Sequence, residues 1–402
     1  MTSRIQRFLG LGLLLAVIIA VVAFQVFRGA GVAPAPTVVR GIIGGEKEGF
    51  LRSPEIARIL AERHGLRVDF RKAGSIEMVR GDTTGQDFLW PSSQVALELY
   101  QQQRGTADRA QVIFNSPIVL YAYSDVTTKL VEQGFVEQSG ATSYVSTFPA
   151  LIAAIQRGQP WSELGLPLYG AISITTTDPT KSNSGNMFAG LLANTLNGGQ
   201  VVDERTVVPI LPELQTFYQR LGFLYDSSGD LFQQFLTQGV GGFPLIAGYE
   251  SQLIEFNLAN PESRDFLSQE INILYPRPTV WSSHPIIALT PLGDRLLEAL
   301  QDSELQRLAW EQHGFRSGLI GVQNDPAVLD VVGVPATIEQ VIPMPKPAVM
   351  DQIIAALESG PAGAPLSAPP IRPTTPTAAP RRWRGPRSRG SGRPDGFRRS
   401  SS

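Results

Sequence analysis

After position 36, extended and helical patterns of apolar residues alternate along the chain. Residues 37–43 (Thr-Val-Val-Arg-Gly-Ile-Ile) predict a strand that leads into a glycine-rich loop and then a helix. The same order returns at 66–79 and at 87–100. This alternation is typical of α/β folds, whose ligands bind at the carboxyl ends of the strands. We therefore expect one ligand-binding rim formed by the loops that contain Gly45, Ser75, Ser92 and Ser93.

A second pattern occupies residues 170–196. Alternating Ile and small polar residues at 170–177 predict a strand, and apolar residues at helical spacing after position 186 predict a helix. Between them, Ser182, Asn183 and Ser184 supply the side-chain oxygens favoured where a helix begins. The unpaired N–H groups of a helix start bind anions well. The stretch is therefore either a ligand-binding turn or a set of simple helix caps.

Longer apolar runs predict how the chain passes between two halves of the molecule. Residues 112–122 form an extended run long enough to cross from one half to the other, and residues 271–275 and 284–289 can return the chain. We expect a hinge near 116–124 and 276–285. Further predicted helices lie at 147–157, 211–224, 231–236, 293–300 and 303–312, and a strand from 243 ends in a polar turn with Tyr249.

The charge of the chain is unevenly distributed. The whole chain of 402 residues carries −2, and residues 372–402 hold nine arginines and one aspartate, so the remainder carries −10. An acidic body argues against a nucleic-acid partner. Residues 360–402, rich in Pro, Ala, Ser and Arg, have too few apolar side chains to form a core and are predicted to be disordered. With no cysteine, disulfides, thiol catalysis and cysteine-ligated zinc are excluded.

The amino terminus predicts a membrane segment. Arg4 and Arg7 precede an apolar run at 8–27, which as a helix would span about 30 Å, the thickness of a bilayer core. We expect residues 1–30 to be an uncleaved anchor, with 31–36 as a linker and the bulk of the chain on the extracytoplasmic side. A cleaved signal peptide is the alternative, although Pro36 is a poor residue at which to cut after Ala33-Pro34-Ala35.

Several segments together resemble a known family. They are Gly74-Ser75 before a helix, Asp87 to Ser93, Ser116-Pro-Ile-Val-Leu, the turn from Thr177 to Gly185, and Gly314-Phe315-Arg316. In order and spacing they resemble the type 2 periplasmic solute-binding proteins over about residues 37–350, nearest to the molybdate, tungstate and sulfate binders. The resemblance implies two α/β lobes, each a mostly parallel sheet flanked by helices, joined by crossing strands. It also implies a solute handed to an ABC transporter permease.

The resemblance also implies which residues bind and where the lobes divide. Lobe I would comprise 37–116 and 285–350, and lobe II 117–284. The solute would bind Ser75, Ser92 or Ser93, and Ser182, with Asn183, Ser184 and Tyr249 as neighbours. The first loop departs from the family pattern, because it carries Glu46, Lys47 and Glu48. Acidic residues beside an anion would weaken its binding. An oxyanion is the favoured solute, and the first loop leaves the identity of the solute open.

Enzymatic and metal-dependent alternatives have weaker support. His64, His284 and His313 lie in contexts that supply no base to a serine, and no Gly-x-Ser-x-Gly, His-Glu-x-x-His or nucleotide-binding loop is present. We expect neither an enzyme nor a cofactor. A cation held by Glu46, Asp87, Asp178 and Glu250 remains an alternative. The other functional hypothesis is a membrane-anchored binding-fold module that acts as a sensor or protein-interaction partner without transport.

Overall fold

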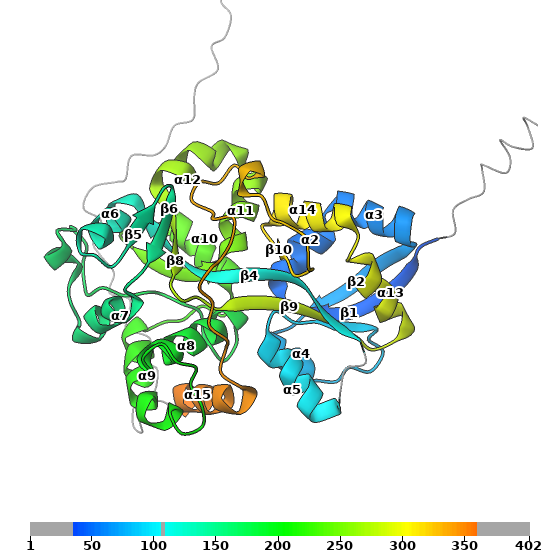
Figure 1. Cartoon of the computed structure of the whole chain (residues 1–402), viewed down its shortest axis with the longest axis horizontal. Coiled ribbons are helices and arrows are strands. Elements are labelled where there is room, and N and C mark those ends of the chain that lie inside the picture. Colours follow the sequence, from blue (N-terminus) through cyan, green and yellow to red (C-terminus); the bar gives the residue numbers. More distant parts are fainter. Residues whose placement is uncertain (1–34, 106–108, 360–402) are drawn as a thin grey trace, which may run out of the picture. The chain divides into compact units, whose positions relative to one another are not determined.

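Two long strands join the halves of one mixed sheet. The computed structural model describes residues 35–105 and 109–359, and its strand order is β2-β1-β3-β9-β4-β8-β6-β5, with β7 and β10 also paired to β4. The first part of β4 (Ala110–Tyr123) pairs with β9 (Trp281–Ala288), and its last part pairs with β7 and β8. Figure 1 shows β4 and β9 crossing between two lobes. The predicted two-lobed α/β fold is confirmed.

Lobe I is built on three parallel strands that follow one another in the chain. Strand β1 (Thr37–Ile43) lies between β2 (Leu66–Lys72) and β3 (Phe88–Trp90), and β3 continues antiparallel to β9. The remaining elements of this lobe are η1 (Gly45–Lys47), α2 (Glu48–Arg52), α3 (Pro54–His64), α4 (Ser75–Arg80), α5 (Gln94–Arg104), α13 (Pro291–Ala299), α14 (Ser303–His313) and β10 (Arg316–Ser317).

The strand pleat of lobe I distributes apolar side chains to both faces of the sheet. Val39 and Ile43 of β1 pack in one cluster with Trp90, whereas Ile42 packs on the other face with Leu89. Successive strand residues point to opposite faces, so a strand covered by helices on both sides must be apolar at nearly every position. In the strand at 37–43 the second half follows this rule, since Gly41, Ile42 and Ile43 are all buried, whereas Thr37 and Arg40 are exposed.

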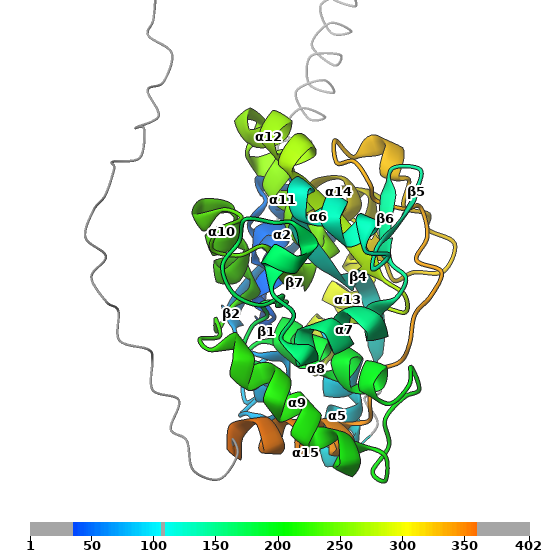
Figure 2. The ribbon, with the colours of Figure 1, turned by 90° about the vertical axis from the view of Figure 1, so that its left-hand side faces the viewer.

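Lobe II surrounds the second part of β4. Its strands are β5 (Glu137–Ser139), β6 (Thr142–Val145), β7 (Leu245–Tyr249) and β8 (Ile271–Pro276), of which β6 and β8 pair parallel. Its helices are α6 (Ser124–Glu132), α7 (Phe148–Arg157), η2 (Trp161–Leu164), α8 (Asn183–Leu196), α9 (Val207–Leu221), α10 (Ser228–Gln238), α11 (Glu250–Ala259), η3 (Pro261–Ser263) and α12 (Arg264–Glu270). In Figure 2, α6 and α11 lie above β7, and α8 and α9 lie below it. After η4 (Pro326–Val328), helix α15 (Pro347–Ser359) packs against α9, α8 and α5.

Two local predictions differ from the structure. Residues 170–177 form isolated bridges, such as Thr175 with Ile246 and Thr177 with Tyr225, instead of a regular strand. The bridges contact different segments, so no continuous ladder forms. The polar turn expected after the strand from 243 is instead the start of helix α11, which begins at Glu250 directly after Tyr249.

A buried ion pair lies beside the crossing strands. Arg316 Nε donates to Glu250 Oε2 over 2.6 Å, and Nη2 donates to Oε1 over 2.8 Å. Tyr275 OH donates to the same Oε1 over 2.6 Å. Strand β10, which contains Arg316, pairs with the lobe I part of β4, whereas Glu250 begins α11 of lobe II. The pair therefore connects the two lobes.

Three predictions concern residues outside the described ranges. The segment at 8–27, the linker at 31–36 up to residue 34, and the tail at 360–402 all lie there. Within 35–105 and 109–359, none of the helices has the length and apolarity to cross a membrane. The anchor and the disordered tail stay predictions.

Candidate functional site

A cleft of about 560 Å³ lies between the two lobes. Lobe I contributes the loops that follow β1 and β2, and lobe II contributes the starts of α8, α10 and α11. The lining is mostly polar and charged: Gly44, Gly45, Glu46, Glu48, Gly49, Lys72, Ala73, Gly74, Ser75, Lys181, Ser182, Asn183, Asp226, Ser227, Ser228, Gly229, Tyr249, Ser251, Gln252 and Glu255. Both lobes therefore contribute to the cleft. The loops after β1 and β2 lie on one side, and the turn at 177–185 lies on the other.

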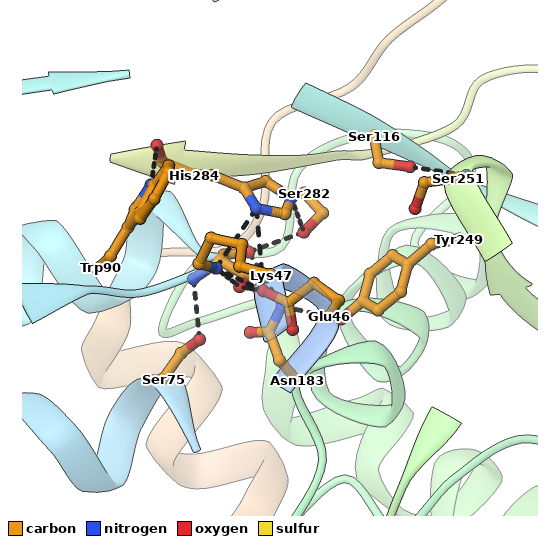
Figure 3. A network of polar contacts seen from close by, with 11 residues as sticks. Glu46, Lys47, Ser75, Trp90, Ser116, Asn183, Tyr249, Ser251, Ser282 and His284 are labelled. Atoms are coloured by element: carbon orange, nitrogen blue, oxygen red, sulfur yellow. Dashed lines mark hydrogen bonds and ion pairs between the residues drawn. The ribbon is translucent and has the colours of Figure 1, made fainter. Parts of the chain in front are cut away.

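The lobe I side of the cleft rests on a network around Lys47 (Figure 3). The Lys47 side chain is completely buried, and its Nζ donates to Glu46 Oε1, to Ser92 Oγ at 2.6 Å and to His284 Nδ1 at 3.3 Å. Ser92 Oγ in turn donates to Glu46 Oε1. An ammonium group has three hydrogens, and each of them here has an acceptor. Lys47 therefore holds together a buried network, which we call the floor of the cleft, and its side chain does not face the cleft.

The network fixes the tautomer of His284. Because Nδ1 accepts from the Lys47 ammonium, the ring proton of the neutral imidazole lies on Nε2, which is 3.4 Å from Ser282 Oγ. Ser282 Oγ donates to the Ser92 carbonyl over 2.7 Å, and Trp90 Nε1 donates to the His284 carbonyl over 3.1 Å. These two hydrogen bonds connect strand β9 to β3 and to the loop that follows β3.

Burial controls the ionisation of this floor. It lowers the pKa of Lys47, although the adjacent Glu46 carboxylate opposes the change. Burial, with a smaller contribution from Lys47, lowers the pKa of His284 well below its ordinary range, so the imidazole is neutral at pH 7. Burial, assisted by Glu46, also raises the pKa of Tyr249, whose phenol stays protonated.

We expect His284 to make the folded protein less stable in mild acid. Its pKa is lower in the folded state than in the unfolded chain, where it is about 6.5. Below that pH the unfolded chain binds a proton that the native state does not, so stability falls by up to about 1.4 kcal/mol per pH unit. The fall ends where the pH reaches the folded-state pKa.

Urea unfolding between pH 7.5 and pH 5 measures this effect. His284→Gln should show a shallower loss of stability on acidification than the unmodified protein. His64→Gln is the matched control, because His64 is partly exposed at the end of α3 and contacts Asp302. Parallel curves for His284→Gln and the unmodified protein would contradict the prediction.

The lobe II wall presents hydroxyl groups at the start of α8. Ser182 occupies the N-cap position, but its side chain makes no capping hydrogen bond. Instead Ser182 Oγ lies 3.0 Å from Ser184 Oγ, which lies 2.8 Å from Thr177 Oγ1. A Cβ at position 185 would collide with the Thr177 carbonyl, so glycine is required for the turn to pack on the helix. Ser182 lines the cleft, so its hydroxyl lies where a solute would contact it.

Asn183 links the two walls. Its Nδ2 donates to the Ser92 carbonyl over 2.8 Å and to Tyr249 OH over 3.0 Å. A carbonyl oxygen can only accept, which fixes the orientation of the amide group. Its Oδ1 is buried and has no hydrogen-bond partner among the described residues.

The structure divides the predicted ligand-binding residues into two groups. Those that line the cleft are Gly45, Ser75, Ser182, Asn183 and Tyr249. Those buried behind this surface are Ser92, Ser93 and Ser184. Ser75 Oγ accepts the Ser92 N–H over 2.9 Å, so the first two loops also support each other. The ligand-binding roles themselves stay predictions.

Sequence reasoning missed two members of the network. The sequence pattern indicated only that His284 supplies no base to a serine, and it did not point to Ser282, yet both residues belong to the floor. These residues alternate in β9 and therefore point to the same face of the sheet. Their alternation in the sequence could have indicated that the two side chains share a face of the sheet. It could not have indicated which residues they contact.

The carboxylates considered for a cation lie apart. Glu46 contacts Lys47, Glu250 contacts Arg316, Asp87 accepts from Thr290, and Asp178 accepts from its neighbour Thr180. Within the described part of the chain, no three His, Asp or Glu residues are grouped so as to hold a metal ion. The described residues therefore give no support to a metal centre.

Comparison with known proteins supports the fold. Neither a scan against family models nor a search of curated proteins finds a match to the sequence. The structure is similar to the substrate-binding protein of an ABC transporter from Agrobacterium tumefaciens, with a TM-score of 0.53, 16% identity and coverage of 82% of this chain and 96% of that chain. It is also similar to iron-bound HitA from Pseudomonas aeruginosa, with a TM-score of 0.53, 12% identity and coverage of 81% and 100%. The chain thus has the fold of the ABC transporter substrate-binding proteins.

Proposed function

We propose that the protein is the extracytoplasmic solute-binding component of an ABC-type uptake system. The observation that carries this proposal is a polar cleft lined by both lobes, which are joined by the crossing strands β4 and β9. Closure of two such lobes around a solute is a known hinge motion. The partner would be an ABC transporter permease, and the predicted segment at 8–27 would hold the protein at the membrane.

Binding, and not catalysis, accounts best for the serine-lysine contact in the floor. Ser92 Oγ and Lys47 Nζ lie 2.6 Å apart, a distance suited to activating a nucleophile. Both side chains are completely buried, so a substrate cannot reach the hydroxyl. Lys47 Nζ also acts as the donor to Ser92 Oγ, and the Ser92 hydroxyl donates to Glu46 Oε1, so the serine proton is not directed at the lysine. We propose that this pair supports the shape of the cleft.

The charge of the solute is a separate question. The resemblance to molybdate, tungstate and sulfate binders favours an oxyanion bound by hydroxyl groups, and Ser75 and Ser182 do line the cleft. Glu46 nevertheless accepts hydrogen bonds from Ser92 and Lys47, so these two donors are not available to an anion on the lobe I side. An oxyanion would have to displace this carboxylate or bind mainly to lobe II.

We expect the lobes to close when a solute binds. A thermal-shift screen with oxyanions, amines, amino acids and sugars would first identify a ligand for residues 35–359. Small-angle scattering with that ligand at saturation should then show a smaller radius of gyration, through bending near 116–124 and 276–285. A radius that does not change would favour the other hypothesis, a sensor or protein-interaction module that does not transport.

A further inference from the structure

We propose that Glu46 determines the specificity of the cleft and that its carboxylate receives an ammonium or guanidinium group of the solute. The inference rests on the proposed solute-binding function and narrows its ligand to an organic cation. It follows from three features of the cleft: which donors are already used, which acceptors remain, and how the charges are paired.

Three donors on the lobe I side are used within the protein. Lys47 Nζ and Ser92 Oγ both donate to Glu46 Oε1, so the carboxylate lies where an oxyanion would otherwise bind. The Ser92 N–H is also used, because it donates to Ser75 Oγ over 2.9 Å. The carboxylate of Glu46 therefore acts as a built-in anion. A second anion at this place would meet electrostatic repulsion.

Two acceptor atoms in this part of the cleft have no donor among the described residues. Within the described ranges, both contacts to the Glu46 carboxylate from Lys47 and Ser92 involve Oε1, and the side chain lines the cleft at 13% exposure. Oε2 is left for a solute. Asn183 Oδ1 is a second acceptor without a donor among these residues, because the other end of the amide is held by the Ser92 carbonyl and Tyr249 OH. A carboxylate oxygen without a donor on lobe I and a buried amide oxygen without a donor on lobe II together match a group with several N–H donors.

The charges of the cleft lining also favour a cationic solute. Four carboxylates line the cleft, Glu46, Glu48, Asp226 and Glu255, against two lysines, Lys72 and Lys181. Each lysine is already paired, Lys72 with Glu48 at 2.6 Å and Lys181 with Asp226 at 3.0 Å. No unpaired cation of the lining is therefore left for an anionic solute.

Glu46 can receive a cation although Lys47 is close. Lys47 is absent from the lining and is completely buried, whereas Glu46 lies between Lys47 and Tyr249 in Figure 3. The carboxylate thus separates the ammonium from the cleft. A metal ion is a poorer candidate, since no cluster of three His, Asp or Glu residues occurs in the described part of the chain. An organic amine or guanidinium needs only hydrogen-bond acceptors and one negative charge.

Isothermal titration calorimetry with agmatine, putrescine, sulfate and molybdate tests the inference. The unmodified protein should bind agmatine or putrescine. Glu46→Gln keeps the shape of the side chain and removes its charge, and it should weaken amine binding at least tenfold. Glu46→Asp keeps the negative charge. Comparing its amine affinity with that of Glu46→Gln shows whether the loss of binding comes from the loss of charge. Melting curves of each variant confirm that the compared proteins are folded.

Glu62→Gln is the matched control. Glu62 is an exposed carboxylate of α3 outside the cleft lining, where it is paired with Arg58, so amine affinity should change less than threefold. Amine affinity that is unchanged in folded Glu46→Gln would overturn the inference. Tight binding of sulfate or molybdate by the unmodified protein, without amine binding, would overturn it and leave the solute-binding proposal intact. Binding of none of the four probes would overturn it as well, and closure with another ligand would then decide the proposed function.

Discussion

Replacing Arg316 with methionine is expected to destabilise the folded protein by about 3–5 kcal/mol. Arg316 and Glu250 are both buried, and the guanidinium forms two hydrogen bonds with the carboxylate. Arg316→Met would leave Glu250 as a buried charge whose remaining side-chain donor is Tyr275 OH. Removing one partner of a buried pair costs more than removing both, because an uncompensated charge remains. Chemical unfolding with guanidinium chloride measures the loss.

A surface arginine of α14 provides the matched control for Arg316. Arg307→Met removes ion pairs with Glu304 and Glu311, but this side chain is 46% exposed, so the cost should stay below about 1 kcal/mol. The double variant Arg316→Met with Glu250→Leu should be more stable than Arg316→Met alone. Equal losses for Arg316→Met and Arg307→Met would show that the buried pair has no special role.

The second large effect should come from the hydroxyl of Ser182. For a charged solute group, one hydrogen bond contributes about 1.5–3 kcal/mol, so Ser182→Ala should weaken binding about ten- to a hundredfold. The melting temperature should change little, because Ser182 makes no capping bond and Ser184 Oγ keeps Thr177 as its partner. Calorimetry and a melting curve on the same sample separate the two effects.

Ser75→Ala should behave differently from Ser182→Ala. Loss of the Ser75 hydroxyl removes the acceptor of the buried Ser92 N–H. This should lower the free energy of unfolding by about 1–3 kcal/mol, in addition to any loss of affinity. Ser268→Ala, on the surface of α12 and outside the cleft lining, is the control for both variants. If Ser182→Ala lowered the melting temperature and left affinity unchanged, the serine would have only a structural role.

The strands and helices of lobe I could be predicted because local patterns determine them. The predicted strand at 37–43 is β1, and the helix expected after the glycine-rich loop includes α3, which begins at Pro54. Alternating apolar residues, a proline at the first helical position and glycine at a helix end act over a few neighbouring residues. The repeated order of strand, loop and helix then indicated the α/β fold and the rim on which Gly45 and Ser75 lie.

Predictions were less successful where pairing depends on distant partners. Residues 170–177 have the alternation of a strand, but Thr175 and Thr177 pair with different segments, so only isolated bridges form. Sequence reasoning likewise treated Glu46 and Lys47 as a departure from a family pattern. Their role in the floor depends on Ser92 and on His284, a residue 237 positions away from Lys47.

The sequence alone determined the α/β class, the order of the elements in lobe I and the small polar residues at the carboxyl ends of its strands. These follow from short-range preferences of the backbone and from the periodic burial of apolar side chains. The tertiary structure decided the direction of each polar group in the cleft. It placed the Glu46 carboxylate on the donors of Ser92 and Lys47, and it buried Arg316 against Glu250, 66 residues away. Burial and charge pairing depend on which segments meet in space, and no local pattern encodes that.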